Sequence, residues 1–148
     1  MQDLEARYQA ALQAALKGLA EGGIPIGAAL YAGDTLVASG HNQRVQKSSP
    51  ILHGEIDCLS NAGRPDPLWA GRMTLFTTLS PCYMCAGAAL IYGVSDIVIG
   101  ENSSFNESEE LLAERGVRVH HLHDAATFDM FDAWTRANPH VWFEDIGR

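Results

Sequence analysis

The stretch MTLFTTLSPCYMCAGAALIYGVSDIVIGE, residues 73–101, decides the fold. Its first seven residues are rich in β-branched and apolar side chains and predict a strand. Ser80 is a good helix N-cap and Pro81 suits the first helical position, so we expect a helix from there to about Tyr92. This helix is apolar nearly all round, which predicts that it is buried. SDIVIGE, residues 95–101, predicts the next strand, and a crossover helix of this kind places its two strands parallel in one sheet.

The same alternation continues toward the C-terminus. ESEELLAERG, residues 107–116, begins with acidic residues and ends at a glycine, which predicts a helix. VRVHHLH, residues 117–123, predicts a strand. A last helix is expected from about Asp124 to Ala137, because Pro139 follows it and precedes the tail HVWFEDIGR.

The N-terminal part predicts a helix and a hairpin. Apolar residues recur at helical spacing from Leu4 to Leu19, and two glycines end the pattern. IGAALYA and TLVASGHN predict two strands joined around residues 32–34, followed by QRVQKSSP as a polar loop. A short helix is expected from about His53 to Asn61. The whole pattern predicts one α/β domain over residues 1–148, a three-layer α/β/α sandwich with a mixed five-stranded sheet that is antiparallel only at the first hairpin.

Composition and charge narrow the possible partners. A hydrophobic fraction of 47% with 19% charged residues is typical of a globular protein, and no apolar run is long enough to span a bilayer. The net charge is -8, and the ten Lys and Arg residues are scattered rather than clustered, which disfavours a nucleic-acid partner and favours a small, uncharged substrate. The N-terminal segment lacks the character of a signal peptide, and three cysteines suit a reducing compartment, so we expect a cytoplasmic protein without a membrane partner.

Cys82 and Cys85 form a C-x-x-C pair at the start of the central helix. Such a pair is compatible with a redox couple, with half of a structural zinc site or with a catalytic metal centre. His53 opens another predicted helix, and one nitrogen with two sulfurs suits zinc. Three protein ligands are typical of a catalytic zinc ion with a free position for water, and Glu55 would then be available to move protons.

The two motifs together resemble the signature of the zinc nucleobase deaminases, H-x-E followed by P-C-x-x-C. EGGIPIGAAL, GHNQRVQK, LHGEI, TLSPCYMCAGA, YGVSDIVIGEN and WFEDIG extend the resemblance along most of the chain, from about residue 21 onward, to the fungal-type cytosine deaminases. The tail WFEDIG lies outside the zinc signature and is similar to the substrate-closing end of that family. Tyr83 and the Asp57-Cys58 pair depart from the family pattern and bear on the fine substrate range.

The resemblance implies a cytidine deaminase-like fold, one zinc ion per chain and a homodimer that converts free cytosine to uracil and ammonia in pyrimidine salvage. It implies that zinc activates a water molecule and that Glu55 shuttles protons. Asp145 would accept the ring N–H that carries ribose in a nucleoside, and Asn42 would bind the carbonyl edge of the base. The complete implied site is His53, Cys82 and Cys85 for zinc, Glu55 for catalysis, and Asn42, Asp145, Gly54, Ser80, Phe105, Trp142 and Ile26 for the substrate.

Several alternatives remain open on the sequence alone. Within the enzyme class they are a deaminase of another small amino-heterocycle, such as guanine or creatinine, and a tRNA adenosine deaminase. Outside it they are the dithiol couple and a zinc-stabilised binding module closed by Cys58 as a fourth ligand, although burial is the more common role of a free cysteine. His120, His121 and His123 alternate faces on a predicted strand and are not expected to bind metal.

Overall fold

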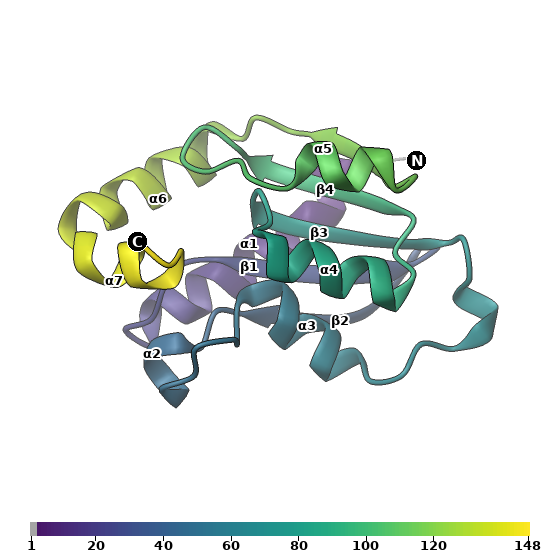
Figure 1. The fold of residues 1–148 in the computed structure, drawn as a ribbon, viewed down its shortest axis with the longest axis horizontal. Coiled ribbons are helices and arrows are strands. Elements are labelled where there is room, and N and C mark those ends of the chain that lie inside the picture. The colour runs from purple at the N-terminus through teal and green to yellow at the C-terminus, as the bar shows by residue number, and fades with distance from the viewer. Residues whose placement is uncertain (1–2) are drawn as a thin grey trace.

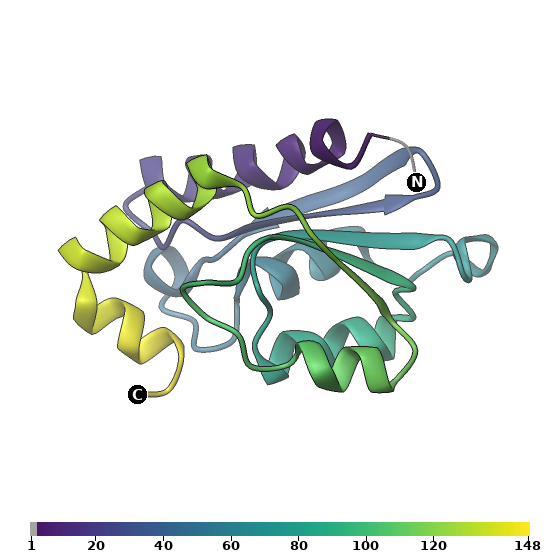
Figure 2. The same cartoon turned by 90° about the horizontal axis from the view of Figure 1, so that it is seen from above.

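A computed structural model of the chain, which describes residues 3–148, contains a five-stranded sheet between two layers of helices (Figure 1). The strand order is β2-β1-β3-β4-β5. The helices α1 and α6 cover one face of the sheet, and α3, α4 and α5 cover the other (Figure 2). The strands are β1 (Gly27–Ala32), β2 (Thr35–His41), β3 (Met73–Leu79), β4 (Asp96–Glu101) and β5 (Arg118–His121). The helices are α1 (Leu4–Ala20), α2 (Arg44–Lys47), α3 (Gly54–Ala62), α4 (Tyr83–Tyr92), α5 (Glu109–Glu114), α6 (Ala125–Ala137) and α7 (Pro139–Asp145), with a short 3₁₀ turn at Pro67–Trp69.

The predicted three-layer sandwich is confirmed, and the sheet order refines it. Strands β3, β4 and β5 are parallel, and β1 is antiparallel to β2 on one side and to β3 on the other. The hairpin is therefore correct, but the prediction missed the second antiparallel pair. The reason is that β1 inserts between β2 and β3, a placement that depends on a connection through α3 rather than on any local pattern.

The central strands are buried on both faces because helices cover each side. In β1, Ala28 and Leu30 pack toward α3 and α4, whereas Ala29 and Tyr31 pack toward α1. A third apolar cluster, with Leu79 at the carboxyl end of β3, gathers residues from the N-terminal loop, the loop after β4, α6 and α7. This third cluster lies at the edge of the sheet where the parallel strands end, the edge at which α/β proteins bind ligands.

Three local predictions were wrong. The helix after β3 begins at Tyr83, with Cys82 as its N-cap, rather than at Ser80 and Pro81. Part of the predicted polar loop forms the single-turn helix α2, and most of the predicted tail forms α7, which starts at Pro139. Helices α2 and α7 both have partners far away in the sequence, because Arg44 of α2 binds Asp145 and Trp142 of α7 packs on Phe105.

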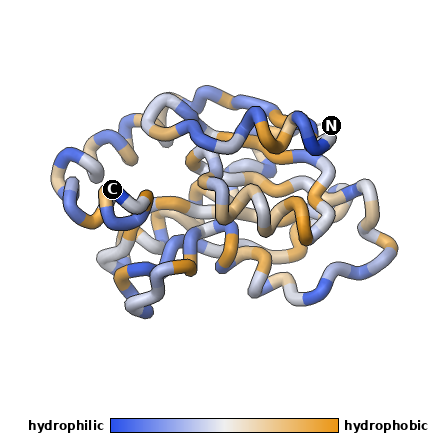
Figure 3. Tube along the Cα trace, viewed as in Figure 1, coloured by the Kyte–Doolittle hydropathy of each residue, from blue (hydrophilic) through white to orange (hydrophobic). Residues whose placement is uncertain are grey.

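Helix α4 is apolar along its length (Figure 3), but only one of its faces is buried in the chain. Cys85, Ala86 and Ala89 face the sheet. Tyr83 and Ile91 are exposed, and Ile91 retains 91% of its accessible surface. The prediction of a fully buried helix is therefore wrong for a single chain. None of the helices within residues 3–148 is long and apolar enough to cross a membrane.

Close packing of α3 on β2 positions the residues at the start of α3. A β-carbon at Gly40 would lie 2.3 Å from the Cys58 backbone nitrogen, which cannot move without moving α3. We expect Gly40→Ala to destabilise the protein by about 1–3 kcal/mol, the usual effect of overpacking a close-packed contact. Urea unfolding measures the change. Ser39→Ala, an exposed neighbour on the same strand, is the control and should stay within about 0.5 kcal/mol of the parent. Equal stability of the two variants would contradict the packing argument.

Candidate active site

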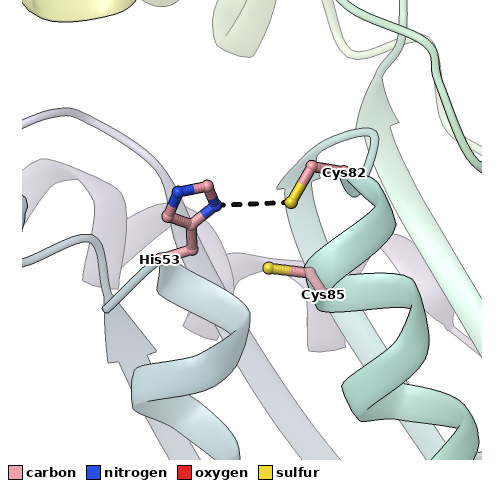
Figure 4. A group of neighbouring side chains, drawn as sticks. All are labelled: His53, Cys82 and Cys85. Atoms are coloured by element: carbon pink, nitrogen blue, oxygen red, sulfur yellow. Dashed lines mark hydrogen bonds between the residues drawn. The ribbon is translucent and has the colours of Figure 1, made fainter. Parts of the chain in front are cut away.

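His53, Cys82 and Cys85 meet at the carboxyl edge of the sheet. His53 is the N-cap of α3, Cys82 is the N-cap of α4, and Cys85 lies in the first turn of α4. Their ligand atoms all lie within 4.8 Å of one another. The His53 imidazole and both sulfurs point toward one another, with His53 Nδ1 3.5 Å from Cys82 Sγ (Figure 4). Within residues 3–148 this is the one group of three or more His, Cys, Asp or Glu side chains placed to hold a metal ion.

The two thiols have different charge states. A hydrogen bond from Cys85 is the largest cause of a fall in the pKa of Cys82 to about 4; the bond with His53 adds to the fall, and burial opposes it. The same bond to Cys82, followed by burial, raises the pKa of Cys85 well above its usual value. Cys82 is therefore a thiolate, and Cys85 is a thiol that would release its proton on binding a metal ion. One imidazole nitrogen and two sulfurs fit zinc.

The Asp145 carboxylate contacts the His53 imidazole. The Asp145 Oδ1 atom lies 3.3 Å from His53 Nε2, on the side of the ring away from the sulfurs. Burial alone would lower the pKa of His53, but hydrogen bonds with Asp145 and Cys82 raise it to about 10. A carboxylate in this position fixes the orientation of a metal-binding imidazole, and its loss typically weakens metal sites.

Glu55 lies in the first turn of α3, beside the metal group and 3% exposed. Burial raises the pKa of Glu55 to about 7, and the negative charge of Cys82 adds to the rise, whereas His53 opposes it. A carboxyl group with a pKa near neutrality can both accept and donate a proton at physiological pH. Its position and its pKa suit the proton-shuttle role expected for it.

A small cavity opens beside the metal group. Its walls are Ile26, His53, Glu55, Leu79, Ser80, Cys82, Phe105, Trp142, Asp145 and Ile146. The Phe105 and Trp142 rings meet edge to face with their centroids 5.9 Å apart, and Trp142 makes a second edge contact with Phe131. Helix α7 therefore closes the cavity with an aromatic side chain that the core holds in place.

Asp145 brings a buried charge into this cavity. Its carboxylate accepts hydrogen bonds from Asn42 Nδ2 at 3.1 Å and from Arg44 Nε at 3.0 Å, in addition to the contact with His53. Burial alone would raise the pKa of Asp145, but the bonds from His53, Asn42 and Arg44 lower it, so the group stays ionised. A substrate that enters the cavity meets a fixed hydrogen-bond acceptor here.

Three of the residues predicted to bind the substrate make other contacts within the protein: Asn42 and Ser80 form hydrogen bonds, and Gly54 packs closely on a neighbouring segment. The Asn42 amide donates to Asp145, and its oxygen accepts from the Arg44 N–H, so this side chain lies behind the cavity wall. The Ser80 N–H donates to the Glu101 carbonyl at 3.1 Å. Gly54 begins α3, where a β-carbon would lie 2.9 Å from the Ile26 carbonyl oxygen. The substrate contacts expected of all three residues stay predictions.

Residues 1–101 match the model of the cytidine and deoxycytidylate deaminase zinc-binding region. The chain belongs to this deaminase family. The family match supports a zinc-dependent deaminase over the two hypotheses of a dithiol couple and a zinc-stabilised binding module. Its zinc is expected at the group of His53 and the two cysteines.

Relatives of known name refine the position of this deaminase within the family. The chain is 47% identical over 140 residues to a cytosine deaminase of Candida albicans, covering 94% of this chain and 93% of that protein. It is 32% identical to a tRNA-specific adenosine deaminase of Streptococcus pyogenes, covering 70% of this chain and 66% of that one. Among solved structures, a guanine deaminase of Nitrosomonas europaea superposes with a TM-score of 0.79 and 27% identity, covering 92% of this chain and 86% of that one.

Cys58 does not join the metal group of this deaminase. It is fully buried on α3, its Sγ donates to the Ala38 carbonyl oxygen at 3.5 Å, and burial raises its pKa to about 12, so it remains a thiol. His120 and His121 pair with Asp96 and Glu109. The three-ligand set is that of a catalytic rather than a closed structural site.

Sequence reasoning missed four residues of the site. Leu79 and Ile146 line the cavity, Arg44 binds Asp145, and Glu109 accepts a hydrogen bond from Ser80 Oγ at 2.5 Å. Ile146 could have been found because it lies within the quoted tail motif. Arg44 and Glu109 carry no local signal, since each acts on a residue far away in the sequence.

Zinc binding provides the first test of the site. We expect Cys82→Ala to lose the one zinc ion per chain, because a thiolate ligand is removed, whereas Cys58→Ala should keep it. Elemental analysis of the purified proteins gives the stoichiometry. Loss of zinc from Cys58→Ala with retention of a native fold would contradict the three-ligand site.

Proposed function

We propose that this deaminase converts free cytosine and water to uracil and ammonia. The observation that carries the proposal is the ionised Asp145 carboxylate in the wall of a closed cavity beside the metal group. The similarity to the Candida albicans cytosine deaminase over nearly the full length of both chains supports it. Guanine and tRNA adenosine are substrates of more distant relatives and are the competing alternatives.

Asp145 selects a free base in this proposal. The ring N1–H of cytosine donates to the Asp145 carboxylate, whereas a nucleoside has ribose at this nitrogen and no proton to offer. A site built to bind a given N–H rejects analogues that lack it by as much as about 10⁴–10⁵-fold, because a buried polar group is left unpaired. Ribose would also meet α7, which closes the cavity through Trp142.

The walls hold the planar ring beside the metal group. Phe105 and Trp142 cover the ring, and Ile26 lies beneath it, with Leu79 and Ile146 completing the apolar lining. These side chains exclude bulk water, which strengthens every charge interaction inside the cavity. The Ser80 and Gly54 backbones supply further polar contacts, and Asn42 contributes through its hydrogen bond to Asp145. The sum of these contacts orients C4 of the ring toward Glu55 and the cysteine pair.

Proton transfer is the task of Glu55. A zinc ion bound by His53, Cys82 and Cys85 supplies a Lewis acid that lowers the pKa of water to about 7. Glu55 takes the proton from the attacking water and delivers it to the ring nitrogen beside C4. The water oxygen bonds to C4 as the ring nitrogen takes that proton. Glu55 then moves the proton of the new C4 hydroxyl to the exocyclic amine, so that the C4–N bond breaks, ammonia leaves and a carbonyl remains at C4. Its pKa of about 7 suits both directions of transfer.

We infer that the 148 residues act as one catalytic domain in the cytoplasm, in the salvage of pyrimidine bases. A net charge of -8 supports a small-molecule substrate rather than a nucleic acid. The product uracil and the substrate cytosine are both uncharged at neutral pH, so an acidic protein surface does not repel them.

We also infer a homodimer that packs α4 against its copy. Tyr83, Met84 and Ile91 form an exposed apolar stripe along α4, with the small residues Gly87 and Ala88 between them. Small residues in the middle of a stripe allow two helices to approach closely, and burial of the stripe would remove the large apolar side chains from water. The resemblance to homodimeric cytosine deaminases points to the same assembly.

Ammonia release from cytosine and from cytidine, measured side by side on the zinc-loaded protein, tests the substrate. We expect turnover of cytosine and nearly none of cytidine or deoxycytidine. Guanine and creatinine, added to the same panel, test the competing small substrates. Comparable turnover of cytosine and cytidine would mean that α7 and Asp145 do not exclude ribose.

The variant Glu55→Gln is the control for the chemistry in this panel. It keeps the shape and one hydrogen-bonding edge but cannot carry a proton, so it should keep zinc and lose about 10²–10⁴-fold or more in kcat. A zinc-loaded Glu55→Gln protein with a near-normal rate would remove Glu55 from the mechanism.

Substitution of the exposed stripe tests the assembly. Ile91→Glu should give a folded monomer at micromolar concentration, because a charge replaces an apolar side chain at the proposed dimer contact. Leu68→Glu is the matched control, since Leu68 is also exposed, at 78%, but lies outside α4. Light scattering gives the masses. A parent protein that is itself monomeric at that concentration would refute the dimer.

A further inference from the structure

Arg44 lies between the C-terminal helix and the segment that leads into His53. It is the first residue of α2, and only 15% of its side chain is exposed. Figure 1 shows α2 and α7 at the same end of the molecule. Arginine with so little exposure is usually paired, and here the guanidinium binds three acceptors from two separate segments.

Each nitrogen of the guanidinium has its own acceptor. Nε donates to Asp145 Oδ1 at 3.0 Å, one terminal nitrogen donates to Glu144 Oε1 at 2.9 Å, and the other donates to the Pro50 carbonyl at 3.2 Å. The Arg44 backbone N–H donates to Asn42 Oδ1 at 2.9 Å, and Asn42 in turn donates to Asp145. The planar fork of arginine reaches three separated acceptors through three different nitrogens, whereas the three N–H groups of lysine share one nitrogen.

The two acidic partners on α7 are consecutive but face different surroundings. The Glu144 side chain is 66% exposed, and the Asp145 side chain is 2% exposed. Arg44 therefore binds both an exposed carboxylate on the outer face of α7 and a buried carboxylate in the cavity. Within residues 3–148, no other Arg or Lys forms an ion pair with α7.

Arg44 also lines the approach to the cavity. A surface hollow has Arg44, Pro50 and Glu144 in its wall. The hollow and the inner cavity share five residues, His53, Cys82, Phe105, Asp145 and Ile146. The two spaces therefore adjoin at these residues, and a substrate that enters through the hollow passes beside the Arg44 contacts.

We propose that Arg44 is a positioning residue that latches α7 over the cavity and holds the Asp145 carboxylate in place for the substrate. The kinetic part of this proposal rests on the proposed cytosine deaminase function. Arg44 holds the Asp145 carboxylate where both the bound substrate and the transition state meet it, so loss of Arg44 weakens the binding of both states by a similar factor. Loss of uniform binding raises KM and leaves kcat nearly unchanged.

The test compares zinc-loaded Arg44→Gln and Arg44→Lys with the parent protein. We expect faster amide hydrogen exchange in α7 for both variants, unchanged zinc content, and a KM for cytosine raised by about tenfold or more with kcat within about threefold, as for the loss of a charge-assisted hydrogen bond. Arg44→Lys keeps the charge and should recover part of the loss, but not all of it, because its donors share one nitrogen and cannot reach all three separated acceptors.

Two further variants separate a latch from a general loss of charge. Arg136→Gln removes an exposed arginine of α6 that pairs with Asp132, and it should change neither exchange in α7 nor KM. Glu144→Gln removes only the outer partner, so it should speed exchange in α7 with a smaller rise in KM. The double variant Arg44→Gln/Glu144→Gln should exchange no faster in α7 than Arg44→Gln alone, because the two residues share one interaction.

Unchanged exchange in α7 for Arg44→Gln and Arg44→Lys would overturn the latch. Faster exchange with an unchanged KM would overturn the link to substrate binding. Hydrogen exchange does not depend on activity, so a parent protein that fails to deaminate cytosine but shows the expected exchange pattern would refute the proposed function and leave the latch standing.

Discussion

The approach of His53 to Cys82, between the first residues of two helices, is the constraint around which the site is arranged. Each helix follows a loop at the carboxyl edge of the sheet, and glycines without side chains let α3 pack closely on β1 and β2. The two helix N-termini carry partial positive charge, which favours a thiolate at Cys82. The approach of His53 to Cys82 also places Glu55 beside the metal group, because Glu55 lies in the first turn of α3, two residues after His53.

A second constraint is charge balance in a closed space. The cavity contains the Cys82 thiolate, the Glu55 carboxyl group and the Asp145 carboxylate, all largely buried. Burial pushes the pKa of Glu55 up, whereas three donors keep Asp145 ionised. Two carboxyl groups in one cavity are thereby given different states, one able to exchange a proton and one fixed as an acceptor. Helix α7 supplies the Asp145 carboxylate, so the same helix both closes the cavity and completes its polar contacts.

The family match ends at residue 101, before α7 begins. The zinc group and Glu55 lie within the matched region, but Phe105, Trp142 and Asp145 lie beyond it. The chemistry is thus encoded in the part that this family shares, and the proposed choice of a free base depends on the part that follows. The similarity to the Candida albicans enzyme covers 94% of this chain and so includes most of this second part, which is why it bears on the substrate as well as on the fold.

Local patterns in the sequence determined the order of strands and helices and the ligand types of the metal group. Apolar periodicity and helix-start residues act over a few positions, so the three-layer fold and the group of His53, Cys82 and Cys85 could be predicted from them. Tertiary structure alone decided the second antiparallel pair of β1, the helices α2 and α7, and the exposed face of α4. It alone joined Arg44 to Asp145, residues that are 101 positions apart. A side chain with three acceptors in distant segments has no local signature, because its partners are chosen by the path of the backbone rather than by its neighbours in the chain.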